Sequence, residues 1–250
     1  AALTLADVDT VNGNITIDTS GDLIAADVDA GGNHNVVLTS ATGDIAVGTA
    51  TATDNTVTLT ATTGSITDDN AAAINVTAAS LTATAATGIN LDTAIASLDA
   101  SVTGIGGIDI DNTSAALALT DVDTVNGSID IGTSGTLAAT DVVAGGAGDV
   151  LLAATGTITI GSVTATGNTV SLTSGASILD DSSDATAITA STINLTTGAG
   201  AAVGSNSGGG AIPLGYLDIV GAPTVNPAAG AADAYVRFVT STDVTSAQVG

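Results

Sequence analysis

The sequence predicts an all-β fold, a parallel β-helix (β-solenoid) with about 21 residues per rung. Three observations lead to this prediction. Apolar and polar residues alternate over short stretches, these stretches recur at a nearly constant spacing, and a longer unit occurs twice. Helix is not expected, because Thr, Val, Ile, Gly, Asn and Asp are weak helix formers and the chain contains neither Glu nor Lys.

Strict alternation predicts short strands with one buried face, as at 14–18, 56–60, 107–111 and 156–160. Gly, Asn or Asp ends each stretch, as expected for tight turns. The alternation also predicts which side chains face the core. The predicted inward residues are Ile15, Ile17, Leu38, Val57, Leu59, Leu81, Leu98, Ile108 and Ile110, and the predicted outward residues are Asp7, Asp9, Asp121 and Asp123.

The spacing of the stretches favours a solenoid. One Ile or Leu recurs at intervals of 17 to 22 residues, at Ile17, Leu38, Leu59, Leu81, Leu98 and Leu119. Such a period is close to the ~20–29 residues of known solenoid repeats. The alternative is a tandem of β-sandwich domains, but it does not explain the inner spacing. Sandwich cores also usually contain aromatic residues, and this chain has two Tyr and one Phe.

A longer unit is duplicated. Residues 7–32 recur as 121–146 with 19 of 26 positions identical, an offset of 114 that later slips to 112. We expect solenoid repeats over 1–200, in two copies of a ~113-residue unit whose second copy starts near 115. Residues 201–250 hold every Pro and every aromatic residue, which predicts diverged rungs or a cap. The duplication also predicts that Asn12-Gly13 and Asn126-Gly127 lie on the same side of the rod, five or six whole rungs apart.

The composition excludes several classes of function. All 25 acidic residues are Asp, Arg237 is the sole strong cation, and the net charge is −24, so nucleic acid and anionic lipid are not expected partners. The absence of Cys removes disulfides and thiolate metal sites. No run of apolar residues is long enough to predict a membrane-spanning helix. The chain opens within its repeat pattern, without an initiator Met or a signal peptide, which predicts a mature product or a piece of a longer protein.

Several strings resemble a known family. They are GDLIAADVDAGG at 21–32, VVLTSATGDIAVG at 36–48, TVTLTATTGSITDD at 56–69 and SLTATAATGI at 80–89. These are similar to repeats of filamentous-haemagglutinin-like adhesins and giant surface proteins of Gram-negative bacteria, exported by two-partner or autotransporter routes. The resemblance covers roughly residues 1–200. It implies a right-handed parallel β-helix, an extracellular or outer-surface location, and a role in adhesion or as a stalk, with no catalytic residues.

Enzyme activity is not predicted, and no catalytic or cofactor-binding residues are proposed. General acid–base chemistry favours His, Glu, Lys, Cys or Tyr, of which the chain has only His34 and two Tyr. His34 lies in a turn-like stretch, and its counterpart in the second copy is Gly148, which favours an exposed loop residue. Asp68-Asp69 and Asp180-Asp181 could flank a glycosidic bond. They occupy the same place in both copies, however, which favours a structural role in turns.

Calcium is the metal that the sequence could accommodate, although no metal ligand is assigned. Asp-x-Asp pairs place two carboxylates on one strand face, and hard oxygen ligands suit Ca²⁺. The alternative is a solvated acidic surface. The pairs are Asp7/Asp9, Asp27/Asp29, Asp109/Asp111 and Asp121/Asp123, and Gly145–Asp149 nearly matches a calcium-binding nonapeptide. Thr-x-Thr strings, as at 56–62 and 82–84, could bind ice on a flat face, but Thr is also simply a favourable outward strand residue.

These observations predict a stiff rod in an extracellular bacterial surface protein, with a structural and adhesive role. The expected partner is a host-cell, surface or matrix receptor, or further copies of the chain. Two alternatives remain open at this point. One is a subunit of a self-assembling extracellular filament or surface layer, and the other is a calcium-dependent binding module.

Overall fold

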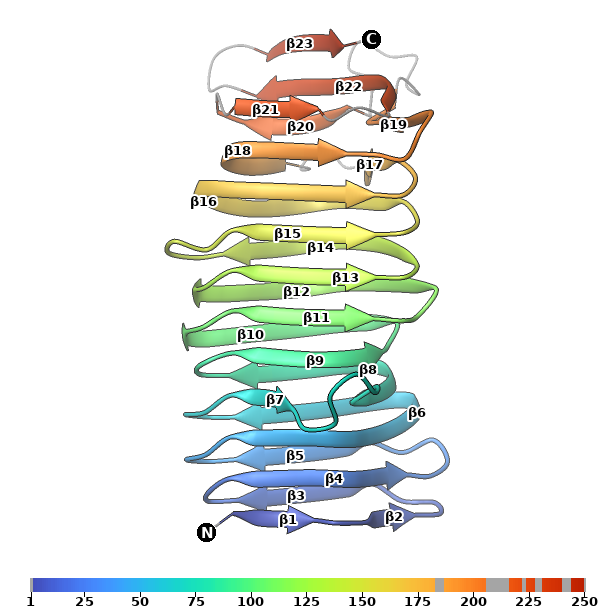
Figure 1. Ribbon diagram of the computed structural model, residues 1–250, viewed down its shortest axis with the longest axis vertical. Helices are drawn as coiled ribbons and strands as arrows, with labels where there is room; N and C mark the ends of the chain where they lie inside the picture. Colours follow the sequence, from blue (N-terminus) through green and yellow to red (C-terminus); the bar gives the residue numbers. More distant parts are fainter. Residues whose placement is uncertain are drawn as a thin grey trace.

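The computed structural model describes residues 2–182, 187–205, 216–221, 224–227, 231–239 and 244–249. These residues form 23 strands and no helix. The chain winds right-handed, running one way along the front of the rod and back along the rear as it rises through about ten turns (Figure 1). The predicted parallel β-helix with about 21 residues per rung is therefore confirmed.

Two stacks of parallel strands form the long sides of the rod, and we call them face A and face B. Face A consists of β1 (Leu3–Leu5), β4 (Leu23–Ala30), the start of β6 (Ile45–Ala61), β7 (Ile66–Asp68), β9 (Ile89–Ala94), β11 (Ile108–Asn112), β13 (Ile129–Thr133), β15 (Val150–Ala154), the end of β16 (Ile158–Ser174), the end of β18 (Ala187–Thr196) and β21 (Thr224–Pro227). Face B consists of β3 (Ile15–Thr19), β5 (Val36–Ser40), the end of β6, the end of β8 (Val76–Ala85), β10 (Ser97–Ile105), β12 (Ala116–Asn126), β14 (Thr136–Ala144), the start of β16, β17 (Ile178–Asp180), β19 (Ala201–Val203) and β22 (Ala231–Val239).

Each rung also has a shorter third segment that prolongs one of the two faces. In the first rungs it prolongs face A, as β2 (Val8–Thr10) and the ends of β4 and the first part of β6. From β10 onward it prolongs face B, as the ends of β12 and β14. The third segment therefore lies at opposite edges of the rod in its two halves.

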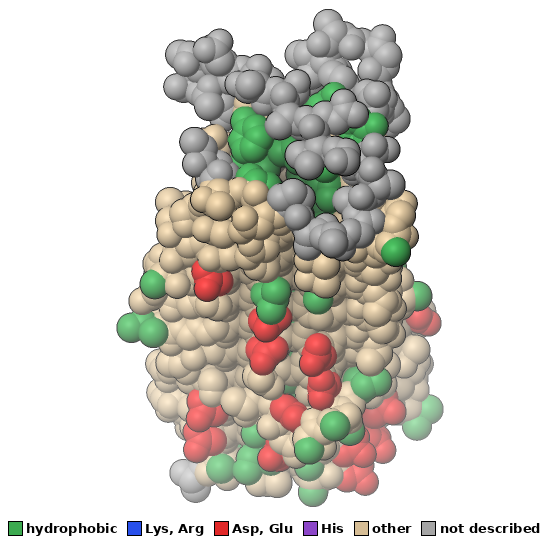
Figure 2. Space-filling model, turned by 45° about the horizontal axis from the view of Figure 1, so that its top comes forward, with side chains coloured by type: hydrophobic (Ala, Val, Ile, Leu, Met, Phe, Trp, Pro, Cys, Tyr) green, Lys and Arg blue, Asp and Glu red, His purple; other side chains and the backbone are tan. Residues whose placement is uncertain are grey.

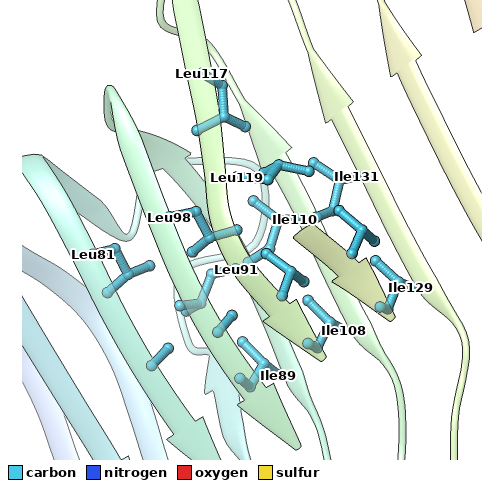
Figure 3. Packing of buried hydrophobic residues seen from close by; sticks show 14 of the residues in the cluster. Leu81, Ile89, Leu91, Leu98, Ile108, Ile110, Leu117, Leu119, Ile129 and Ile131 are labelled. Atoms are coloured by element: carbon cyan, nitrogen blue, oxygen red, sulfur yellow. The ribbon is translucent and has the colours of Figure 1, made fainter. Parts of the chain in front are cut away.

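The core is a continuous double column of aliphatic side chains. On face A the stacked members are Leu23, Ile45, Ile66, Ile89, Ile108, Ile129, Val150, Val170, Ile193 and Val225, and Leu3 stacks on Leu23 but is 39% exposed. Figure 3 shows side chains of the two faces meeting in the interior, for example Leu98 and Leu119 from face B with Ile108 and Ile110 from face A. Burial of this column supplies the main favourable free energy of folding.

The predicted facing of the side chains is confirmed. Eight of the nine predicted inward residues are buried, and Ile17 is partly buried against the same core. Asp7, Asp9 and Asp121 are exposed, and Asp123 is half-buried on the outside. The predicted ladder shifts once, because Leu81 stacks on Val57 rather than on Leu59. The cause is the long connection between β7 and β8, which lengthens that rung.

The two copies of the repeat lie on opposite sides of the rod, and the prediction of the same side was wrong. Asn12-Gly13 leads into Ile15 on face B, whereas Asn126-Gly127 leads into Ile129 on face A. Similarly, Ile45 lies on face A and its counterpart Ile158 lies on face B. The offset therefore corresponds to five and a half rungs. An offset that ends in half a rung is possible because the strands of face A and face B are similarly short and pack their side chains into the same narrow core.

The C-terminal strands end the parallel stack. β20 (Leu217–Val220) lies between β18 and β22, and β23 (Val244–Val249) pairs with β22 in the antiparallel direction. Arg237 donates from Nε and Nη2 to both carboxylate oxygens of Asp218, which is 3% exposed. Tyr216 and Tyr235 meet edge to face with ring centres 5.8 Å apart. Thus the sole strong cation neutralises a buried carboxylate at this end of the rod.

Candidate functional site

Aspartates gather in three groups on the rod, which we call acidic rows 1, 2 and 3. Figure 2 shows such groups on a surface that otherwise carries few charged side chains. Stacking of strands brings their members together from adjacent rungs, as in Asp9 beside Asp29, Asp109 beside Asp130 and Asp99 beside Asp121. Row 1 is Asp7, Asp9, Asp27 and Asp29; row 2 is Asp92, Asp109, Asp111 and Asp130; row 3 is Asp99, Asp121, Asp123 and Asp141.

The acidic rows perturb the ionisation of their own members. Loss of hydration, followed by repulsion from Asp7, Asp27 and Asp29, raises the pKa of Asp9. In row 2, loss of hydration and repulsion from neighbouring aspartates raise the pKa of Asp92, Asp109 and Asp130. In row 3 loss of hydration again raises the pKa of Asp123, partly offset by its hydrogen bond with Ser101. In each row, neighbouring carboxylates thus repel one another, and no cationic side chain offsets the repulsion.

Nothing in the described part of the chain builds a metal site. No group of three or more Asp or His side chains there could hold a metal ion. Gly145–Asp149, the near match to a calcium-binding nonapeptide, has another role, because Asp149 Oδ1 accepts the backbone N–H of Thr169 at 2.8 Å. Rows 1, 2 and 3 therefore have the arrangement expected of a solvated acidic surface.

Many other polar residues hold the turns of successive rungs together. Asp44 Oδ1 accepts the backbone N–H of Ser65 at 2.7 Å, and Asp22 Oδ1 accepts that of Asp44 at 3.2 Å. On the opposite edge Asn14 and Asn35 accept backbone N–H groups in the same way, from Asn35 at 2.9 Å and from Thr56 at 3.1 Å. A side-chain oxygen of one rung thus accepts a hydrogen bond from a backbone N–H of the next rung. Strand pairing provides no acceptor for this N–H group at a corner.

The recurring Asp pairs also stabilise turns. Asp68 Oδ1 accepts the backbone N–H of Asn70 and the side-chain amide of Asn75, both at 2.7 Å. In the second copy Asp180 Oδ2 accepts the backbone N–H of Ser182 at 2.8 Å. The carboxylates of Asp68 and Asp180 thus fold the chain after β7 and β17, in agreement with the structural role favoured from their recurrence.

His34 lies in the turn between β4 and β5, as predicted, but it is half-buried rather than exposed, because its ring packs beside Asn12 and Asn14 of the first rung. Its Nε2 is 2.8 Å from Asn12 Oδ1 and its Nδ1 is 3.3 Å from Asn14 Oδ1. The ring therefore bridges the first two rungs at one edge of the rod. Its two ring nitrogens contact neutral amide groups, rather than a carboxylate that could orient it as a general base.

Two shallow grooves cross face A. The larger, about 660 Å³, runs over four rungs at the ends of β11, β13, β15 and β16, and is lined in part by Asp111, Thr133 and Ser174. The smaller, about 420 Å³, lies at the start of β7, β9, β11 and β13 and is lined in part by Asp109 and Asp130. Their small polar side chains and lack of aromatic rings give little area for burying a ligand.

The polar interior at this edge was not predicted from the sequence. Asn112 is 2% exposed; its Oδ1 accepts from Thr93 Oγ1 at 3.1 Å and from the backbone of Ile95 at 2.9 Å. Its Nδ2 donates to Thr133 Oγ1 at 3.3 Å. The available signal was a polar residue in the inward register at the end of an alternating strand, as in Ile108–Asn112.

The Thr-x-Thr strings do not merge into one flat array. Thr58 stacks on Thr82 and Thr60 on Thr84, but the next rung presents Asp99 and Ser101. Thr49 and Thr51 belong to the prolonged side of face A, beside Asp27 and Asp29. Threonine therefore covers only small patches of the outer surface.

Comparison with family models, with curated proteins and with solved structures gave no match. Among the described residues no helix is long and apolar enough to span a bilayer.

Proposed function

We propose that the chain is a structural rod segment of an extracellular bacterial surface protein, which spaces or displays adhesive regions. One observation carries the proposal: the aliphatic column on face A continues without interruption from Leu3 to Val225. In such a stack each rung is held by its neighbours through backbone hydrogen bonds and apolar contact. We expect a rod of stacked rungs of this kind to resist bending along its whole length.

The polar residues support the same proposal. Asp44, Asp68 and Asp149 accept hydrogen bonds at turns, and Asn112 does so in the interior, so these four side chains help to hold the rungs of the rod together. The adhesive role and the bacterial surface location come from the resemblance of residues 1–200 to adhesin repeats. We expect the receptor to be a host-cell, surface or matrix component.

Mechanical testing addresses the rod. The chain is tethered at both ends and stretched in an atomic-force microscope, with a bundle of helices of similar length as the comparison. We expect resistance to higher force, followed by stepwise loss of rungs. Extension at low force without steps would refute the structural role. Adhesion is tested separately, by coating beads with the chain and measuring their retention on epithelial cells and on extracellular matrix.

Self-assembly into a filament or surface layer is the second candidate. What supports it is the repeated parallel pairing of strands, as of β4 with β1 and with β6, which a strand of another chain could continue at an edge of the stack. Electron microscopy of the purified chain separates the candidates, because a filament subunit gives polymers whereas a rod segment gives particles of uniform short length.

A further inference from the structure

The connection between β7 and β8, residues 69–75, is the longest between two strands for which the structure describes every residue. Figure 1 shows it as an irregular segment outside the stacked strands. Its middle part, which we call loop 71–74, consists of four exposed residues, Ala71, Ala72, Ala73 and Ile74. Within the described part of the chain none of their backbone N–H groups donates a hydrogen bond. The hydrogen bonds that join the rungs therefore do not hold this loop.

Both ends of loop 71–74 are fixed. Before the loop, Asp69 donates its backbone N–H to the carbonyl oxygen of Val47 at 2.9 Å. The next residue, Asn70, donates its backbone N–H to Asp68 Oδ1 at 2.7 Å. After the loop, Asn75 is 1% exposed, and its Nδ2 donates to the same carbonyl oxygen of Val47 at 2.8 Å. Movement of the loop is thus confined to its four residues, and the adjoining rungs can stay closed while it opens.

The backbone of the loop also favours opening. Ala71 has a φ of 62°, in the left-handed region that is unfavourable for a residue with a Cβ atom. Proteins that bind a peptide as an added strand hold it in an extended conformation, and proteases bind their substrates in this way. Extending loop 71–74 would relieve the unfavourable conformation of Ala71 without separating any pair of strands.

We propose that loop 71–74 is a processing site for a protease that accepts small apolar residues, and that the cut rod stays in one piece. Three consecutive alanines fit the small specificity pocket of an elastase-type serine protease. The serine of the protease attacks an alanine carbonyl carbon, and the peptide bond breaks as the leaving amine takes a proton. Water then hydrolyses the acyl-enzyme and leaves a carboxylate on the alanine. This inference does not depend on the proposed function.

The stack of rungs joins the two fragments. A cut after Ala72 leaves β6 and β7 in one fragment and β8 in the other. β6 pairs with β8 along both of its parts, from Ala50 beside Val76 to Ala61 beside Ala85. All four of these side chains are fully buried. Backbone pairing and the apolar core therefore both continue across the cut.

Accessibility is tested with one substitution at two places. Ala72→Lys and Ala115→Lys each give the chain its sole lysine, in both cases at an exposed alanine. Ala115 lies in the short connection between β11 and β12, where its carbonyl oxygen accepts the N–H of Thr136 at 3.0 Å. We expect trypsin to cut after residue 72 at least about tenfold faster than after residue 115, because the second site must first lose contacts between rungs. Equal rates, or a faster cut after residue 115, would overturn the proposal.

Specificity is tested on the parent chain with pancreatic elastase, and mass spectrometry locates the new termini. Among the described residues we expect the first cut to follow Ala71, Ala72 or Ala73. Replacing these three alanines with Asp should abolish that cut, because a carboxylate does not fit a small apolar pocket. A first cut at another described residue, or continued cutting of the loop in the Asp variant, would show that the loop is not recognised by its alanines.

Assembly is tested on the Ala72→Lys chain after trypsin has cut it. We expect both fragments to elute together from a size-exclusion column in buffer, at the position of the uncut chain, and to separate in urea. The unfolding midpoint of the cut rod should rise with its concentration, because folding now joins two chains. Release of either fragment in buffer would show that the stack does not hold the cut rod together.

Discussion

Leu59→Asp gives the sharpest test of the fold. Leu59 is fully buried in β6, stacked between Leu38 of one rung and Ala83 of the next. No cation lies in this core to pair with a carboxylate, since the sole Arg is at the C-terminal end with Asp218. Thr58, the preceding residue on the same strand, points outward between Val37 and Thr82 and supplies a matched control.

The magnitude follows from two contributions. Removing the buried leucine side chain costs about 2–5 kcal/mol through lost burial and a residual cavity. The introduced carboxyl must also be neutral inside the core. Protonating at pH 7 a group whose normal pKa is about 3.9 costs about 4 kcal/mol, at 1.36 kcal/mol per unit. Leu59→Asp should therefore destabilise by at least about 6 kcal/mol, Leu59→Ala by about 2–5 kcal/mol, and Thr58→Asp by less than about 1 kcal/mol.

The assay is urea unfolding followed by circular dichroism at several pH values. The introduced carboxyl has a raised pKa in the folded state, so the deficit of Leu59→Asp should shrink as the pH falls from 7 towards 4. Thr58→Asp should show no comparable recovery. If Leu59→Asp were soluble with the unfolding midpoint of the parent chain, the assigned facing of β6 would be wrong.

Three further predictions concern charge and packing. The folded-state pKa values of five aspartates are raised, namely those of Asp9, Asp92, Asp109, Asp123 and Asp130. Their contribution to stability is therefore fully present below the normal pKa of 3.8 and is lost as the pH rises through the raised values. Thermal unfolding should shift to higher temperature on mild acidification, and a midpoint that does not change with pH would contradict this. NaCl and CaCl₂ at equal ionic strength should stabilise the chain alike by screening, whereas a larger calorimetric effect of micromolar Ca²⁺ would reveal a specific site. Gly127→Ala should cost about 1–3 kcal/mol because its new methyl group would meet Gly106, while the equivalent Gly13→Ala should stay within about 0.5 kcal/mol in the same urea titration.

Alternation and spacing were sufficient to predict the rung and the direction of its side chains. In a narrow solenoid every strand has one face in the core, so Leu38, Leu59 and Leu98 had only one possible orientation once the alternation was read. Recurrence also predicted the structural role of Asp68, because a residue that appears twice at a turn is most simply explained by the turn.

The sequence could not reveal how the copies are placed around the axis. The rotation between Asn12 and Asn126 is the sum of small insertions, such as the lengthened rung after β7 that moves Leu81 onto Val57. Each insertion is neutral with respect to the alternating pattern, so the pattern does not record it. The Asp pairs along a strand could be read from the sequence, but which aspartates of neighbouring rungs meet, such as Asp9 and Asp29 or Asp109 and Asp130, depends on the register between rungs.

Because the two copies are offset by five and a half rungs, related aspartates lie on opposite sides of the rod. Asp7, Asp9 and Asp27 recur as Asp121, Asp123 and Asp141, but the second set is turned to the opposite side. A molecule that recognises exposed carboxylates would therefore find aspartates on either of these two sides of the rod, although Val143 replaces Asp29 in the second set. If such molecules bind, one rod could hold two of them on opposite sides, whereas a single flat surface could meet only one set of aspartates at a time.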